Sequence, residues 1–199
     1  MCVLTEIPEY EIHTPKGKIK VNPAFDTVLE IQKLYQEDDI TDFEKVNQAL
    51  CMLVENEKVL NLLTILEKRK LLEIITQKHI SIKKRHQPKS SGAPVLDFEE
   101  DGDYIFASFM QDYQIDLIEE QGKLPWKKFM YLFNGLSEHT KIRQVMRIRS
   151  MDIPQYNGKN GKQIQEIQDL KSYYALPVKG NGGKNGLDLL FSTLEGMTK

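Results

Sequence analysis

Apolar residues recur at helical spacing along most of this 199-residue chain and alternate with polar residues only near its start. The stretches 10–14 and 18–21 show this alternation on either side of Pro15-Lys16-Gly17, which predicts a β-hairpin. Every longer apolar pattern after the hairpin has a helical period. The sequence therefore predicts a mainly α fold, multi-helical and bundle-like, with one small N-terminal β-hairpin.

Two helices are expected directly after the hairpin. Asn22 is predicted to cap the first helix, with Pro23 at its first helical position. Thr41-Asp42-Phe43-Glu44 has the spacing of a capping box, so it predicts the start of the second helix. We expect the two helices to pair antiparallel. Their predicted inward residues are Phe25, Val28, Leu29, Leu34, Phe43, Val46, Ala49, Leu50 and Leu53.

The segment from Glu57 to about Ile80 carries apolar residues on more than one helical face. We predict a helix here, with a break near Lys68-Arg69-Lys70. Such a helix is either buried on several sides or in contact with another subunit, and burial within the monomer is the favoured alternative. For a surface that binds a partner, the candidate residues are Leu63, Leu72 and Ile75.

Three short helices are predicted between Asp97 and Ile153. An acidic run, 97–103, leads into the first helix, which ends at Tyr113. Leu124-Pro125-Trp126 starts the second helix, and Gly135 ends it. Ser137 is expected to cap the third helix, which continues until Pro154. The bulky aromatic residues of this region are the predicted structural anchors: Trp126, Phe106, Phe109, Phe129 and Phe133.

Changes in composition divide the chain into four parts. Residues 1–82 hold the hairpin and the first helices, and residues 83–96 form a basic linker or loop with proline and serine. Residues 97–178 form a second helical part that packs with the first and includes one further helix at 163–174. Residues 179–199 are predicted to be a flexible glycine-rich tail, although Leu187 to Leu194 is apolar enough to dock or to bind a partner. We favour one domain, because neither helical part alone has a complete core.

Composition limits the classes of protein to which the chain can belong. The net charge of −2 gives no overall attraction to nucleic acid or to acidic membranes. No apolar run approaches the ~20 residues that cross a bilayer, and the first residues lack the pattern of a secretion signal. Cys2 and Cys51 are too few for a disulfide framework or a zinc site, and we expect both to be free thiols, with Cys51 in the core. These features predict a protein that is kept in a cytoplasm.

The chain offers little that resembles a catalytic or metal site. Asp97, Glu99, Asp101 and Gly102 match places of a calcium-binding loop, but Ser108 stands where the bidentate glutamate is needed, so we expect no calcium binding. The glycine-rich stretch 180–186 lacks the lysine and hydroxyl residue of a phosphate-binding loop. The four histidines have no metal-ligand spacing and are expected at the surface or its boundary: His13, His79, His86 and His139. We predict no catalytic residue, no cofactor and no metal, and therefore no enzyme.

Two basic groups raise an alternative function. The linker contains Lys83-Lys84-Arg85 and Lys89, and the predicted third helix carries further basic side chains at 141–149. Neither group alternates with exposed aromatic residues, so a solvated surface is favoured over nucleic-acid binding. The alternative is a small helical DNA-binding regulator that uses this linker together with Lys141, Arg143, Arg147 and Arg149.

The order of these segments resembles a known family. The hairpin and the Asn-Pro start of the next helix are followed, after the linker, by Tyr104-Ile105-Phe106-Ala107-Ser108-Phe109 and Tyr113-Gln114-Ile115-Asp116-Leu117. Leu124-Pro125-Trp126-Lys127-Lys128-Phe129 and Gly135-Leu136-Ser137 complete the likeness, which covers roughly residues 10–153. In this order the chain resembles small tail proteins of long-tailed phages and prophages of Gram-positive bacteria, which are regarded as tail assembly chaperones.

This resemblance implies a non-enzymatic helical protein in the cytoplasm of the bacterial host. Its expected partners are the long tape-measure protein, which it would keep soluble, and the tail-tube protein. Self-association stays open, and neither a membrane nor a nucleic acid is an expected partner. The resemblance implies no catalytic residue.

Overall fold

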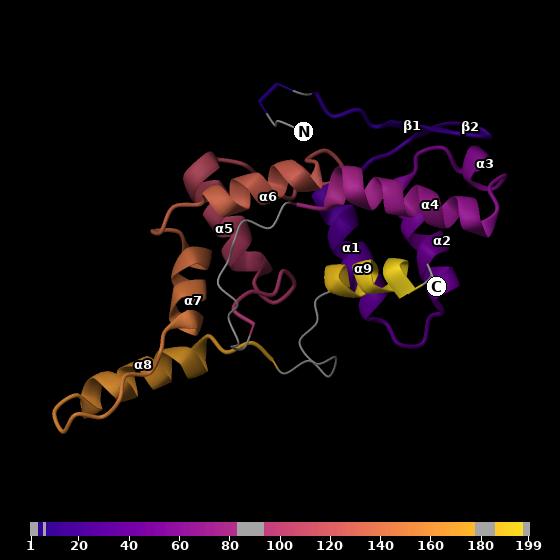
Figure 1. Ribbon diagram of the computed structural model, residues 1–199. Coiled ribbons are helices and arrows are strands. Elements are labelled where there is room, and N and C mark those ends of the chain that lie inside the picture. The colour runs from indigo at the N-terminus through magenta and orange to yellow at the C-terminus, as the bar shows by residue number, and fades with distance from the viewer. Residues whose placement is uncertain (1–3, 6, 83–93, 178–185, 197–199) are drawn as a thin grey trace. The chain divides into compact units, whose positions relative to one another are not determined.

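Helices make up most of the protein in a computed structural model that describes residues 4, 5, 7–82, 94–177 and 186–196 (Figure 1). The described strands form one two-stranded antiparallel sheet near the N-terminus. The predicted mainly α fold with a small hairpin is therefore confirmed.

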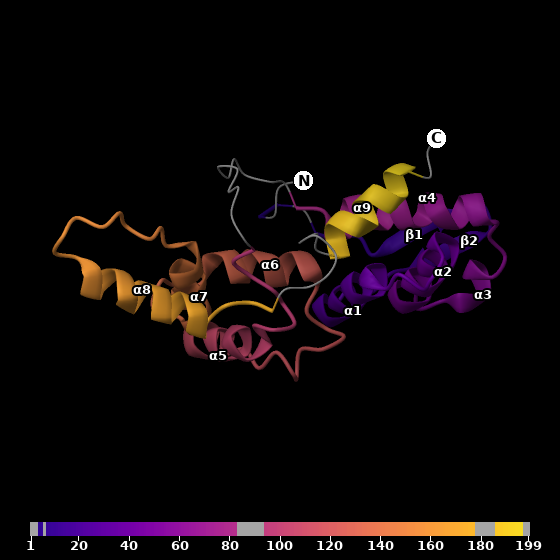
Figure 2. The same cartoon turned by 90° about the horizontal axis from the view of Figure 1, so that it is seen from below.

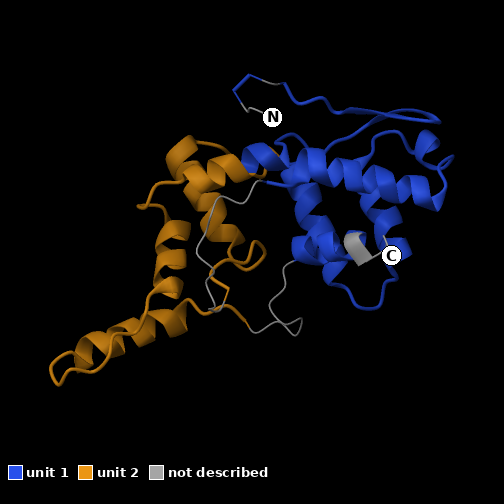
Figure 3. Cartoon of the chain, viewed as in Figure 1, with its two compact units in different colours: residues 1–83, 121–129, 184–199 blue, residues 84–120, 130–183 orange. Residues whose placement is uncertain are grey.

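The chain groups into two compact units, which Figure 3 shows in different colours. Unit 1 consists of residues 1–83, 121–129 and 184–199, and unit 2 consists of residues 84–120 and 130–183. Residues 121–129 and the C-terminal segment thus group with the N-terminal part rather than with their neighbours in sequence. Most of the predicted linker, 83–93, and the glycine-rich stretch 178–185 lie outside the described residues.

The hairpin consists of β1 (Glu11–Thr14) and β2 (Gly17–Lys20). Ile12 pairs with Ile19, and both side chains are buried, as expected from the alternating pattern. Gly17 makes the turn with a φ of 140°, a conformation that residues with a side chain rarely adopt.

Helices α1 (Phe25–Gln36) and α2 (Asp42–Leu53) follow the hairpin and contact each other. The capping box predicted at Thr41 and Glu44 is present. Asn22 is not the cap of α1, because Ala24 takes that position and the Asn22 side chain donates a hydrogen bond to the Gly122 carbonyl instead (2.9 Å).

Two residues that we predicted inside lie at the surface of α2. Phe43 is 50% exposed, because the buried stripe of this helix begins only at Lys45 and Val46. Cys51 is an exposed free thiol, since it follows Leu50 and therefore points about 100° away from the buried stripe. Both predictions were wrong. Cys2 lies outside the described residues.

The apolar segment after α2 contains α3 (Glu57–Leu60), α4 (Ile65–Ile75) and a π-helical turn, η1 (Thr76–Ile80). The break falls before Thr64 rather than near Lys68-Arg69-Lys70. Thr64 and Glu67 form a second capping box that starts α4, whereas the basic triplet continues the helix.

Most helices of unit 2 lie close to their predicted places. They are α5 (Gly102–Tyr113), α6 (Trp126–Gly135, whose first four residues group with unit 1), α7 (Lys141–Ser150) and α8 (Gly161–Tyr173). Ser137 does not cap α7: its backbone N–H and its hydroxyl both donate to the Asp112 carboxylate, and the helix starts after Thr140. Helix α8 contacts α7 and has no buried residue.

The C-terminal segment forms a helix, α9 (Gly186–Gly196), where we predicted a flexible tail. Leu190 and Leu194 lie one helical turn apart and are buried in unit 1. Figure 2 shows α9 beside α1, with which it packs, and near α4. The apolar stripe of this segment thus finds a docking face within the chain.

Candidate functional site

The three residues suggested for partner binding are buried in unit 1. Leu63 is 7% exposed, and Leu72 and Ile75 are fully buried. These side chains are therefore buried within the monomer, and a partner cannot reach them in the folded unit.

Other apolar side chains of the same segment are exposed. Leu62 is 63% exposed, Ile65 42% and Leu66 66%. They lie where α3 ends and α4 begins, and the Thr64–Glu67 capping box fixes the start of α4 between them. We call Leu62, Ile65 and Leu66 the α3–α4 corner. A group of large apolar side chains at a fixed helix start is a candidate surface for a protein partner.

The predicted aromatic core divides between the two units. In unit 1, Trp126 stacks on Phe129 with 5.7 Å between ring centroids, and Phe129 stacks on Phe25 at 4.9 Å. The Trp126 indole N–H donates to the Ile80 carbonyl at 3.1 Å, and its side chain is 1% exposed. These contacts make Trp126 and Phe129 anchors of unit 1.

The other predicted anchors belong to unit 2. Phe109 is fully buried and packs edge-on against Tyr113, and Phe133 is buried beside Phe98. Phe106 is only half-buried. The predicted anchors thus divide between two aromatic groups, one in each unit.

A buried ion pair, which the sequence did not predict, holds unit 2 together. The Arg149 guanidinium donates two hydrogen bonds to the Asp101 carboxylate, at 2.6 and 2.8 Å. The Asp101 side chain is fully buried and that of Arg149 is 8% exposed. Arg149 also donates to the carbonyls of Val95 (3.1 Å) and Tyr174 (2.6 Å). One side chain therefore joins α5, α7 and the end of α8.

The acidic run before α5 also makes hydrogen bonds within the protein. Asp97 accepts hydrogen bonds from the backbone N–H groups of Glu99 and Glu100, and Asp101 accepts one from Asp97 besides those from Arg149. One carboxylate oxygen of Asp97 and both of Asp101 are thus engaged within the protein. Among the described residues no group of three or more His, Cys, Asp or Glu side chains is placed to hold a metal ion.

The basic side chains of α7 mostly make contacts within unit 2. The Lys141 ammonium lies over the rings of Tyr104 and Tyr174 and donates to the Tyr174 hydroxyl at 2.6 Å, which raises the pKa of Lys141. Arg143 bonds Glu138, and Arg149 is the buried partner of Asp101. The helix offers little of the free positive charge that phosphate contacts require. The basic residues of the linker, and His86, lie outside the described part of the chain.

His79 is buried rather than at the surface or its boundary. Its ring stacks on Tyr10 with centroids 5.3 Å apart, and its Nε2 has no hydrogen-bond partner among the described residues. Burial, together with the positive charges of Lys127 and Lys78, lowers the pKa of His79 to about 4. The imidazole is therefore neutral near pH 7 and acts as a packed ring within η1.

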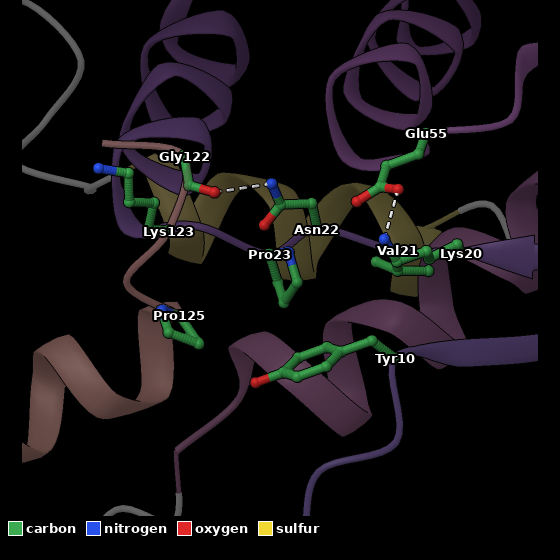
Figure 4. Close-up of a pocket in the computed structure, with 9 residues that line it drawn as sticks. All are labelled: Tyr10, Lys20, Val21, Asn22, Pro23, Glu55, Gly122, Lys123 and Pro125. Atoms are coloured by element: carbon green, nitrogen blue, oxygen red, sulfur yellow. Dashed lines mark hydrogen bonds and ion pairs between the residues drawn. The ribbon is translucent and has the colours of Figure 1, made fainter. Parts of the chain in front are cut away.

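Figure 4 shows a pocket of unit 1 with Tyr10, the residue on which His79 stacks, on one side and Pro23 and Pro125 on the other. Asn22 donates to the Gly122 carbonyl, and Lys20 forms an ion pair with Glu55 at 2.8 Å. These polar groups fasten the end of the hairpin to neighbouring segments. Among the residues that line the pocket, no nucleophile is paired with a base.

In the described ranges, every helix is too short or too polar to cross a bilayer.

A family model described as Bacteriophage Gp15 protein matches residues 4–176, a region that runs through α8 and ends before α9. No curated protein and no solved structure matches the chain significantly.

Proposed function

Because this chain belongs to the Bacteriophage Gp15 protein family, we propose that it is a tail assembly chaperone, which binds the tape-measure protein and assists the assembly of tail-tube subunits around it. The family match, which covers residues 4–176, is the observation that carries this proposal. It supports a role in phage structure or assembly. The resemblance of residues 10–153 to small tail proteins extends it to a chaperone without catalytic activity, in the cytoplasm of a Gram-positive host.

We propose the α3–α4 corner as the surface that contacts the tape-measure protein. A chaperone needs apolar side chains that an apolar segment can reach, and Leu62 and Leu66 are each more than 60% exposed. Leu62 lies in the turn before α4 and Leu66 lies in the first turn of that helix, so an apolar segment that docks at the helix start can contact both. Leu63, which lies between them, is buried and supports the corner from inside.

Contacts of this size should be individually weak. Three exposed aliphatic side chains are few compared with the 20–30 residues that each partner contributes to a stable interface. Weak contacts suit a chaperone that tube subunits later displace. Many copies on one long chain would then provide avidity.

Co-expression tests the proposal. The tape-measure protein of the same phage is produced with or without this chain, and we measure its soluble fraction and its co-purification. Wild-type chain should raise the soluble fraction and co-purify. The double substitution Leu62→Asp and Leu66→Asp should remove both effects while the circular dichroism spectrum stays unchanged, because both side chains are exposed.

Asn61→Asp is the matched control. This residue is exposed beside the corner, so the substitution adds a carboxylate there without removing an apolar contact. It should therefore preserve binding. A tape-measure protein that is equally soluble alone and never co-purifies would refute the chaperone function.

A further inference from the structure

Helix α9 covers a face of unit 1 that belongs to the matched family region, although α9 itself lies outside that region. The covered face consists of α1 around Gln32 and of α4 at Arg69, and we call it the docking face. Three residues of α9 at a spacing of four are buried against it: Gly186, Leu190 and Leu194. Such spacing places the three residues on one side of a helix.

The fit of α9 on this face is specific at both ends of the helix. At Gly186 the two backbones approach so closely that a Cβ atom would overlap the carbonyl of Gln32, so only glycine fits there. Near the other end, the Arg69 guanidinium donates to the Leu194 carbonyl at 3.0 Å. A cation at that position stabilises the C-terminal end of any helix bound in this direction.

Another helix could also replace α9 on the docking face. A helix of 11 residues is marginally stable alone in water, so α9 depends on the docking face for its order. Gln32, whose backbone meets α9 at Gly186, buries its side-chain nitrogen with no hydrogen-bond partner among the described residues. An unsatisfied buried donor lowers the stability of the folded unit at this contact. The face therefore orders an amphipathic helix without holding it as firmly as a continuous core would.

We infer that the docking face binds an amphipathic helical segment of the partner protein, and that α9 closes this face in cis as an autoinhibitory contact. The segment would carry a glycine followed by leucine-like residues four and eight positions later. That the segment belongs to the tape-measure protein rests on the proposed function. Because α9 is part of the same chain as the docking face, a competing helix must overcome a high local concentration of α9.

A peptide assay tests the docking face without the tape-measure protein. The probe is a fluorescein-labelled peptide with the sequence of residues 184–199, and its fluorescence anisotropy is measured against three full-length chains. The chain with Leu190→Asp and Leu194→Asp, whose own α9 is released, should bind the peptide at least about tenfold more tightly than wild type. Ser192→Asp is the control, because Ser192 is exposed on α9. It should behave like wild type, and a peptide with the two aspartates should not bind.

Two results would overturn the inference. One is a folded Leu190→Asp and Leu194→Asp chain that does not bind the peptide, and the other is a wild-type chain that binds it equally well. Gly186→Leu provides a second way to release α9, because its side chain would clash with α1. If both variants lose their helical circular dichroism signal, α9 is part of the core and autoinhibition is excluded.

Co-expression then separates the two proposals. The released variants should co-purify more tape-measure protein than wild type does. Peptide binding without any co-purification would leave the docking face intact and refute the proposed function. Co-purification without peptide binding would support the proposed function and refute the docking face.

Discussion

Replacing Trp126 by alanine should remove a large part of the stability of unit 1. The substitution empties a site that is 1% exposed, for which a loss of about 3–5 kcal/mol is typical. It also takes the stacking partner of Phe129 away and leaves the Ile80 carbonyl without its indole donor. A domain of this size is stable by only about 5–15 kcal/mol, so the loss is a large part of the total.

Urea unfolding measures this loss. With a denaturant dependence of about 2 kcal/mol per molar urea, the midpoint should fall by about 1.5–2.5 M. Far-UV circular dichroism is the appropriate signal, because Trp126 is the only tryptophan and the variant lacks its fluorescence. Trp126→Phe keeps an aromatic ring but loses the hydrogen bond to Ile80, so it should cost about 1–2 kcal/mol.

Lys128→Ala is the control, since this side chain is exposed on the same helix and its loss should change stability by no more than about 0.5 kcal/mol. If Trp126→Ala left the midpoint where it is in wild type, the argument from burial and stacking would be refuted.

Three further predictions concern charge. Because the pKa of His79 is about 4 in the folded chain and near 6.5 when unfolded, the unfolded state binds more protons between these values, and stability should fall by about 2–3 kcal/mol as pH falls from 6.5 to 4. Urea titrations at several pH values should show a smaller decrease for His79→Phe, and equal slopes would contradict the assignment. Asp101→Asn should cost about 3–5 kcal/mol in thermal unfolding because it leaves Arg149 buried without its anion, and adding Arg149→Met should restore part of that loss. Millimolar calcium should leave the melting temperature unchanged, since Arg149 already occupies the Asp101 carboxylate, and a rise of several degrees would show an ion site.

Local patterns in the sequence predicted most helices of this fold. The capping box at Thr41 and Glu44 is correct, and Thr64 and Glu67 have the same spacing, so the break before α4 could have been found from the same signal. Ser137 shows the limit of such reasoning. A residue suited to cap a helix can bond a carboxylate elsewhere, here Asp112, and only the fold decides between the two.

Periodicity did not identify the candidate surface. A segment with apolar residues on several faces does not reveal which of them neighbouring helices cover, so the buried Leu63 and the exposed Leu62 and Leu66 could not be distinguished. Nor does a pattern of local repeats identify contacts between residues far apart in sequence. Asp101 and Arg149 appeared as parts of an acidic run and a basic helix, and their pairing depends on how α5 and α7 meet.

The return of residues 121–129 to unit 1 sets the order in which the chain can fold during synthesis. Trp126 and Phe129 stack in a core whose earlier members precede residue 83, so that core lacks its aromatic stack until the ribosome has added the start of α6. Leu190 and Leu194 of α9 join the same core only near the end of synthesis. Unit 2 needs the chain up to the end of α8, because Arg149 also donates to the carbonyl of Tyr174. Neither unit is one uninterrupted stretch, so the nascent chain keeps apolar surface exposed until most of it has been translated.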